Sequence, residues 1–318
     1  MNTNEIKIIG VGATGNQVLE RIPFGSIKNT DCIVCDIDSM NLEKSSVQYK
    51  ILLGKGIVKS SSIESMVEIG INSVLNSELD LAMNSAIDSF YQLDSLFDKS
   101  SKMVILVARL GDTTEAGIIP VIAQIAKKRG LFVVAIVYTP FDFEGEMKKK
   151  IADKGLKKLG DDCDCILVIK HSKIGKIYGN LGFKSSFGKA DDIVIRLAKI
   201  LLPLGSINAD WLDLKIFFKK NQGIKPFFIG IAEGDGNDRA KNAIELALKN
   251  TFSERDVFAG VSNVLLQINF GSIKITTDEM GQINDLILNI LEKEGSVTMS
   301  VSEDILLGDA LSVIIIAY

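Results

Sequence analysis

The stretch that decides the fold is IIGVGATGNQVLERI, which runs from Ile8 to Ile22. It begins as a short apolar run typical of a buried strand and ends with the residue spacing of a helix. Between the two lie Gly10, Gly12 and Gly15. Glycine permits positive φ and a close backbone approach, and the N–H groups at a helix N-terminus attract phosphate. The stretch therefore predicts a strand–turn–helix unit. Its turn fits a dinucleotide-binding turn, a mononucleotide loop or a plain tight turn.

The alternation of strands and helices continues through the first half of the chain. Runs rich in Val and Ile predict strands over residues 6–9, 32–36, 103–107, 131–137 and 166–169. Helices are predicted over residues 117–129 and 144–159, and a glycine follows each of them. Strands that are apolar almost throughout are buried on both faces of a parallel sheet. The predicted fold class is therefore α/β, with a doubly wound parallel sheet.

The second half of the chain changes character. Helical spacing predicts a long central helix over residues 188–202, ended by Pro203 and Gly205. Strand-like runs follow at 225–231, 261–270, 297–301 and 311–317, with helix-like stretches at 238–248 and 278–291. Two strands in succession at the end indicate a smaller α+β domain. We predict a nucleotide-binding domain over 1–185, a central helix and loop region over 186–222, and a C-terminal domain over 223–318.

Composition narrows the class of protein. The 318 residues are 47% apolar and 24% charged, which favours a sizeable core over disorder. The net charge is −4 and no basic block stands out, so nucleic-acid binding is not expected. No apolar run reaches the ~20 residues that span a bilayer, and the N-terminus lacks a signal-peptide layout. We therefore expect a cytoplasmic protein without a direct membrane anchor.

The cysteines and the single histidine do not predict a metal site. Cys32, Cys35, Cys163 and Cys165 lie in apolar, strand-like stretches, where free cysteine packs as a small hydrophobic residue. His171 follows a predicted strand, and the chain has no second histidine. We expect His171 to be a surface loop residue rather than a ligand or a base.

Three later motifs, in this order, are the most specific feature of the sequence. They are TPFDFEGEMKKK from Thr139, SFGKADDIVIRLAKILLPLGSINADWLDLKIFF from Ser186, and GIAEGDGNDRAKNAIELAL from Gly230. Together with the glycine turn they resemble FtsZ, the bacterial tubulin homologue. The resemblance extends from Ile6 to about Phe270 and is weaker beyond. It implies a GTP- or GDP-binding cytoskeletal protein of the cell-division type, which polymerises head to tail with itself or with another FtsZ.

The resemblance also implies a catalytic loop that one subunit inserts into the next. The pattern Asn-x-Asp-x-x-Asp is matched by Asn208, Asp210 and Asp213. Carboxylates of this kind polarise an attacking water at the γ-phosphate, and Mg²⁺ can accompany the nucleotide. The plainer alternative is that Asp210 or Asp213 caps the following helix.

Nucleotide contacts are carried over from the resemblance position by position. The implied contacts are Gly10, Gly12, Ala13, Thr14, Gly15 and Asn16 in the first turn, Gly111, Thr113, Thr114 and Gly117 in the second, Glu144 and Lys148 at the ribose, and Phe187 and Asp191 at the guanine. Lys148 stands where the family has Arg and lacks the planar fork of that residue. Without the resemblance, Phe187 and Asp191 read as an ordinary helix start with a core aromatic.

The departures from the family concentrate where phosphates would bind. The first turn is one residue shorter. The loop equivalent to Gly-Gly-Gly-Thr-Gly-Thr-Gly reads ARLGDTTEAG from Ala108, in which Asp112 and Glu115 add negative charge. Like charges ~4 Å apart repel by about 4 kcal/mol at an effective dielectric constant near 20. Arg109 can offset this repulsion or itself hold a phosphate. A Gly/Ala-rich segment is replaced by SSSIESM at residues 60–66.

Three functions fit these observations. The first is a divergent FtsZ-like GTPase with weak or altered activity. The second is a pseudo-GTPase scaffold or co-polymer that has lost GTP and GDP. The third is a nicotinamide-dependent oxidoreductase that uses the glycine turn, with Asp36 at the ribose, but the sequence offers it no hydride-transfer site. The chain ends in LSVIIIAY, a strand-like run, so we expect no C-terminal adaptor-binding tail.

Overall fold

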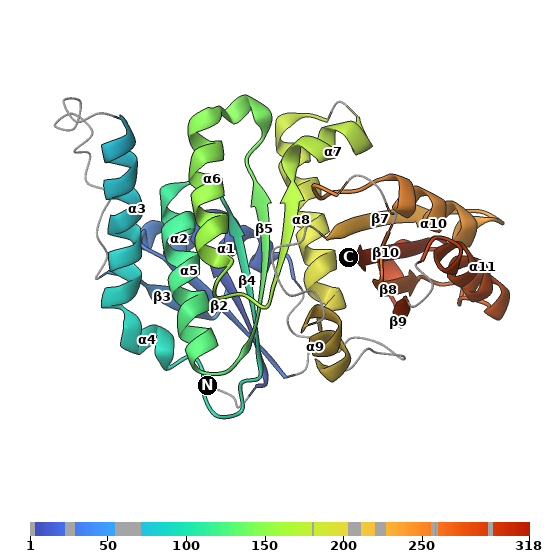
Figure 1. Ribbon diagram of the computed structural model, residues 1–318, viewed down its shortest axis with the longest axis horizontal. Coiled ribbons are helices and arrows are strands. Elements are labelled where there is room, and N and C mark those ends of the chain that lie inside the picture. The colour runs from blue at the N-terminus through green and yellow to red at the C-terminus, as the bar shows by residue number, and fades with distance from the viewer. Residues whose placement is uncertain are drawn as a thin grey trace. The chain divides into compact units, whose positions relative to one another are not determined.

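The computed structural model of the protein describes residues 4–22, 29–54, 71–179, 181–202, 211–219, 227–255, 258, 260–291 and 295–318. It contains two compact units, Met1–Ile166 and Leu167–Tyr318 (Figure 1). The predicted division at residues 185 and 222 stays a prediction.

The first sheet is parallel, and all of it except residues 167–170 of its last strand belongs to the first unit. Its strands are β1 (Ile6–Val11), β2 (Thr30–Asp36), β3 (Tyr49–Leu52), β4 (Met103–Arg109), β5 (Phe132–Thr139) and β6 (Cys165–Lys170), in the order β3-β2-β1-β4-β5-β6. Every residue of β1 is buried, as the nearly continuous apolar run predicts. The predicted α/β class is confirmed. Strand β3 was not predicted, because its four residues pair only with β2 and are mostly half-exposed.

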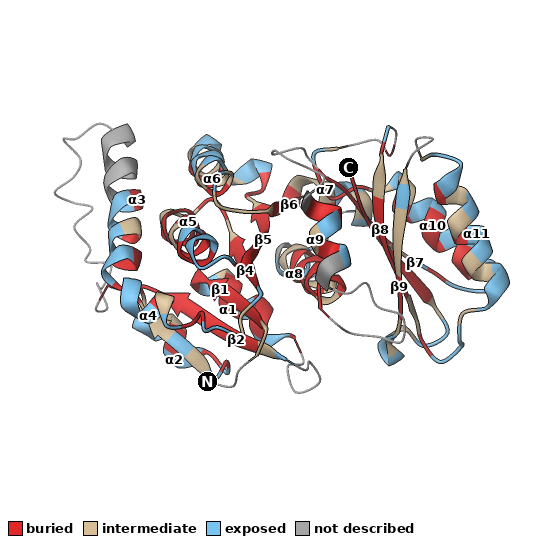
Figure 2. Cartoon of the chain, turned by 60° about the horizontal axis from the view of Figure 1, so that its bottom comes forward, coloured by how far each residue is buried: buried red, intermediate tan, exposed pale blue. Residues whose placement is uncertain are grey.

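Helices pack against this sheet and against one another. They are α1 (Gly12–Glu20), α2 (Ser39–Lys44), α3 (Ile71–Asp88), α4 (Phe90–Asp94), α5 (Thr113–Lys128) and α6 (Glu146–Leu159), with a short 3-10 turn η3 (Asp142–Glu144). Helix α1 contacts β1, β2 and β4, and α5 contacts β1, β4 and β5, while α3 and α6 pack on α5. In Figure 2 the strands between these helices are buried almost throughout.

One buried charge interrupts the apolar strands. Lys7 in β1 is fully buried, and its Nζ lies 2.5 Å from Oδ2 of Asp31, its register partner in β2. Asn4 donates to the other oxygen of Asp31 at 2.7 Å. A buried charge is tolerated only when it is paired and hydrogen-bonded, so this pair fixes the register of β1 against β2.

The second unit combines helices with a mixed sheet. Its elements are α7 (His171–Tyr178), α8 (Phe183–Ile200), α9 (Trp211–Lys219), β7 (Phe228–Gly234), α10 (Arg239–Lys249), β8 (Asn263–Phe270), α11 (Thr277–Leu288), β9 (Ser296–Glu303), a 3-10 turn η4 (Ile305–Leu307) and β10 (Leu311–Ala317). The strand order is β7-β10-β8-β9, antiparallel around β10 and parallel between β8 and β9. The two closing strands and the α+β character were predicted correctly.

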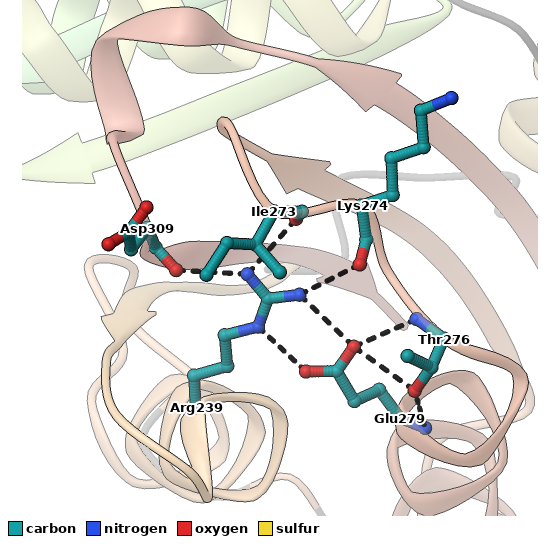
Figure 3. A network of polar contacts seen from close by, with 6 residues as sticks. All are labelled: Arg239, Ile273, Lys274, Thr276, Glu279 and Asp309. Carbon is teal, nitrogen blue, oxygen red and sulfur yellow. Dashed lines mark hydrogen bonds and ion pairs between the residues drawn. The ribbon is translucent and has the colours of Figure 1, made fainter.

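A buried arginine ties the loops of this sheet together (Figure 3). Arg239, at the start of α10, holds the carboxylate of Glu279 with Nε at 2.7 Å and Nη2 at 3.1 Å. Its remaining donors reach the backbone oxygens of Ile273, Lys274 and Asp309 at 2.9–3.0 Å. Each of the five guanidinium N–H groups thus has a hydrogen-bond acceptor. Figure 3 also shows Glu279 bonded to Thr276, in the capping box that starts α11.

We expect Arg239→Lys to lower the free energy of unfolding of the protein by about 1–3 kcal/mol, because lysine cannot replace the planar fork and leaves carbonyl oxygens unpaired. Arg255→Lys is the control, since the hydrogen bond that half-buried Arg255 donates to the carbonyl oxygen of Gly260 is exposed to solvent. Denaturant titration measures both variants. Equal stability of the two variants would contradict the importance of this network.

Candidate functional site

The strand order of the first sheet indicates at which edge a ligand would bind. From β1 the sheet continues through β2 to β3, and from β4 it continues the other way through β5 to β6. In open α/β sheets, ligands bind outside the carboxyl ends of the strands at such a reversal point. Strand β1 runs directly into α1, and β4 runs through a short turn into α5. The two turns that the sequence analysis singled out therefore meet at this edge.

The first turn requires glycine because the backbone crosses itself closely. A Cβ added at Gly10 would lie 2.6 Å from the oxygen of Gly15, and one at Gly15 would lie 2.7 Å from the oxygen of Val107 in β4. Real Cβ contacts are essentially never this short. Gly12 has φ +72°, a left-handed conformation that favours glycine. Gly10 and Gly15 thus let α1 lie against β1 and β4, while Ala13 is exposed and Thr14 is half-buried.

Two polar residues at this edge are held by neighbouring segments. Asn16 in α1 is buried, accepts from the Ser45 hydroxyl, and donates to the backbone oxygen of Asn41 at 3.3 Å. Asp36, at the end of β2, accepts from Asp38 N and Asn41 Nδ2, both at 3.0 Å. Burial raises the pKa of Asp36 above its ordinary value despite these bonds. The Asp36 carboxylate, which a dinucleotide would need for its ribose, therefore already accepts hydrogen bonds from the segment that follows β2.

The second turn is shorter than the sequence predicted. Helix α5 begins at Thr113, so the prediction of a loop as far as residue 117 is wrong. Gly111 precedes the helix with φ +127°. Thr114 is buried in the first helical turn. A Cβ at Gly117 would lie 2.8 Å from Ala82 Cβ, so this glycine allows the close packing of α5 on α3. The helix starts early because tertiary contacts with α3 and the sheet outweigh the weak helix propensity of Gly and Thr.

Four charged side chains beside this turn neutralise one another. Arg109 forms an ion pair with Glu144, and Lys148 Nζ lies 3.3 Å from Glu144 and 3.1 Å from Oδ1 of Asp112. The N–H of Phe141 donates to the other oxygen of Glu144 at 2.8 Å. Burial favours a higher pKa for Glu144, but the bonds from Phe141 and Arg109 outweigh it, so the pKa lies below the ordinary value. A ribose hydroxyl would have to share or displace these partners.

The second acidic residue that the sequence analysis noted lies differently. Glu115 is in the first turn of α5, and only 5% of it is exposed. A Cβ built on Gly12 would lie 2.1 Å from Oε1 of Glu115, so the carboxylate rests directly against the glycine turn. Asp112 is 42% exposed and bound to Lys148. The sequence could not show that Glu115 is buried and Asp112 half-exposed, because each residue only adds one negative charge to the same loop.

The second unit holds the remaining predicted residues that the structure describes. The prediction of a surface loop for His171 is wrong: it is fully buried as the first residue of α7. Its ring meets that of Phe187 edge-on, with centroids 5.5 Å apart. Phe187 is half-buried in α8, and Asp191 lies one turn further along and is buried. The contact could not be predicted from the sequence, in which His171 is simply a single histidine after a strand.

Of the loop that the sequence analysis predicts to be catalytic, the structure describes only the end. Asp213 lies exposed in the first turn of α9. Asn208, Asp210 and residues 60–66 lie outside the described residues.

Within the described ranges, no group of three or more His, Cys, Asp or Glu side chains could hold a metal ion. Mg²⁺ at this site would depend on nucleotide phosphates, as Mg²⁺ commonly does in proteins. The four cysteines are free thiols, and burial raises the pKa of Cys163 to about 12. Among the helices of the described ranges, none is both long and apolar enough to cross a membrane.

Residues 5–179 match the model of the Tubulin/FtsZ family, GTPase domain. The chain is 30% identical over 319 residues to the cell division protein FtsZ of Mycoplasmopsis pulmonis. The aligned region covers 99% of this chain and 77% of that protein. The chain belongs to the Tubulin/FtsZ family. Membership confirms the resemblance to FtsZ and leaves the oxidoreductase alternative without support.

Solved structures of this family share the fold. An FtsZ dimer of M. jannaschii superposes with a TM-score of 0.82 at 26% identity, covering 99% of this chain and 88% of that one. CetZ2 from Haloferax volcanii, in a GTPgS-bound protofilament, superposes with a TM-score of 0.74 at 14% identity, covering 98% and 92%. The second likeness shows the fold alone. Dimer and protofilament are properties of those proteins.

We expect Gly15→Ala to destabilise the protein by about 1–3 kcal/mol or more, because the new methyl group meets the backbone of β1 and β4 and cannot relax. Gly281→Ala, in α11, is the control: nothing lies within 4 Å of its added Cβ. That change should stabilise the protein by about 0.5–1 kcal/mol through helix propensity. Thermal and denaturant unfolding measure both variants, and a neutral Gly15→Ala would refute the proposed close crossing.

The lowered pKa of Glu144 predicts a pH dependence of stability. A carboxylate whose folded pKa lies below its ordinary value of 4.5 stabilises the protein fully above that value, and the contribution is lost as pH falls through the folded pKa. At pH 7, Glu144→Gln should therefore cost about 1–2 kcal/mol. The difference from the wild type should shrink below about pH 4.5, as the wild-type carboxylate becomes protonated.

The control is Glu146→Gln, two residues along the chain, whose side chain is 80% exposed. Denaturant titrations from pH 3 to pH 7 should show no comparable difference for this variant. A pH-independent loss in Glu144→Gln would mean that the shape of the side chain, and not its charge, stabilises the turn.

Proposed function

We propose that this chain is an FtsZ-like cytoskeletal protein that binds guanine nucleotide, assembles head to tail, and has weak or altered GTPase activity. The observation that carries the proposal is the meeting of the β1–α1 and β4–α5 turns at the reversal point of the sheet, within the stretch that matches a GTPase domain. Both α1 and α5 begin at this edge, and helix N-termini favour phosphate.

Residue roles within this proposal follow the resemblance. The phosphates would lie along the first turn, from Gly10 to Asn16, and at the start of α5, near Gly111, Thr113 and Thr114. Gly117 would contribute by holding α5 in place. Glu144 and Lys148 would meet the ribose, once their mutual contacts with Arg109 and Asp112 rearrange. Phe187 would stack on the guanine and Asp191 would accept its N–H donors.

Catalysis in the proposed filament comes from the neighbouring subunit. Asp213, with Asn208 and Asp210, would polarise the water that attacks the γ-phosphate of that neighbour. The exposure of Asp213 supports this role, because a residue that acts on another subunit must be accessible. The dimeric FtsZ and the CetZ2 protofilament are precedents for such association among structures with this fold.

The second candidate is a pseudo-GTPase scaffold that keeps the fold and the assembly surface. The contact of buried Glu115 with Gly12 favours it, because a carboxylate there repels phosphate. Calorimetric titration with GTP, GDP and ATP separates the two candidates. Saturable binding of GTP and GDP but not of ATP supports the first. No heat with GTP or GDP at millimolar concentration supports the scaffold.

Asp213→Asn should abolish phosphate release while leaving the affinity of the separate subunit for GTP unchanged, because the carboxylate acts on the neighbour's nucleotide. Asp278→Asn is the matched control, since it is also exposed in the first turn of a helix. Phosphate release and sedimentation velocity with and without GTP are measured together. Unchanged turnover in Asp213→Asn would remove the catalytic assignment, and a strict monomer at high concentration would remove head-to-tail assembly.

A further inference from the structure

The carboxylate of Glu115 is buried where two helices begin. It belongs to the first turn of α5, and an added Cβ on Gly12, the first residue of α1, would lie 2.1 Å from its Oε1 and 2.5 Å from its Cδ. Only 5% of Glu115 is exposed. Both helices start at the carboxyl ends of the adjacent strands β1 and β4. The carboxyl group of Glu115 thus lies at two helix N-termini.

Helix N-termini carry a partial positive charge and exposed N–H groups, so they stabilise an anion of either kind, carboxylate or phosphate. The stabilisation of the anion is larger where the site is partly buried. The position of Glu115 is therefore electrostatically favourable for the chain without ligand. The same position is the one at which the proposed function places nucleotide phosphates.

Asp112, three residues earlier, does not share this position. Its side chain is 42% exposed, and its Oδ1 lies 3.1 Å from Nζ of Lys148, within the neutral group formed with Arg109 and Glu144. Its charge is already balanced. Of the two acidic residues in the second turn, only Glu115 lies against the glycine turn.

We propose that Glu115 is an internal substitute for a phosphate group: its carboxylate occupies the anion position between the first turns of α1 and α5, and a polyphosphate must displace it to bind there. The inference rests on the proposed function for the identity of the natural ligand, a guanine nucleotide. Glu115 thereby sets the affinity of the site, because part of the binding free energy is used to move a buried carboxylate away from two helix N-termini. It also stabilises the ligand-free chain.

The test uses two variants of Glu115 and one matched control. Glu115→Gln keeps the size of the side chain and removes its charge, Glu115→Ala removes both, and Asp112→Asn removes the other charge of the same turn. The ligands are inorganic tripolyphosphate, GTP, ATP and guanosine, with affinities from calorimetry and thermal unfolding. Guanosine carries no phosphate, so displacement of Glu115 does not affect its binding.

Glu115→Ala should bind tripolyphosphate and GTP about tenfold or more tightly than the wild type, with Glu115→Gln in between and Asp112→Asn gaining less than Glu115→Gln. Without ligand, Glu115→Ala should unfold at a lower temperature than the wild type, and tripolyphosphate should restore the loss. Affinity for guanosine should be the same in the wild type, Glu115→Gln and Glu115→Ala.

Equal affinity of the wild type, Glu115→Gln and Glu115→Ala for GTP would overturn the inference and leave the proposed function intact. Tighter tripolyphosphate binding by both Glu115 variants, with no preference for GTP over ATP and no binding of guanosine, would support the inference and overturn the proposed guanine specificity. If Glu115→Ala does not fold, Glu115→Gln decides, because it preserves the packing against Gly12. A gain in Asp112→Asn equal to that in Glu115→Gln would overturn the assignment to Glu115.

Discussion

The first unit depends on one steric constraint, the passage of α1 over β1 and β4 at backbone contact distance. The carbonyl groups of Gly15 and Val107 lie where side chains would otherwise extend from Gly10 and Gly15. Because no Cβ fits, α1 can start immediately after β1 and lie flat on two strands at once. Strands β1 and β4 are neighbours, and from them the chain adds its next strands in opposite directions across the sheet. This contact therefore also shapes the edge at which α/β proteins bind ligands.

The charged side chains at that edge contact other residues of the same chain. Arg109 and Lys148 bind Glu144 and Asp112, and the buried carboxylate of Glu115 rests against Gly12. Of these residues, Asp112 and Glu115 add negative charge to a loop that the FtsZ resemblance implies to be rich in glycine. In this site the charged groups already contact one another or the glycine turn before a ligand binds. Ligand binding then becomes an exchange of partners, and its net free energy is smaller than the number of contacts suggests.

Sequence patterns predicted the fold where burial alone determines the pattern. The apolar runs of β1, β2, β4 and β5 are buried on both faces, and so is the final strand, β10. Prediction failed where tertiary contacts outweigh local preference. The segment from Thr113 to Gly117 forms a helix because Gly117 packs against α3. His171 is buried against Phe187, although nothing near it in the sequence indicates an aromatic partner.

The sequence by itself determined the positions of the glycines, the alternation of strands and helices, and the relation to FtsZ, since these depend on residue type and spacing along the chain. Tertiary structure alone decided which charges face each other. Asp112 and Glu115 are equally acidic and three residues apart, yet one meets Lys148 near the surface and the other is buried at Gly12. The reason is geometric: Asp112 precedes α5 with an extended backbone, whereas Glu115 lies in the first turn of the helix, so the two side chains leave the chain in different directions.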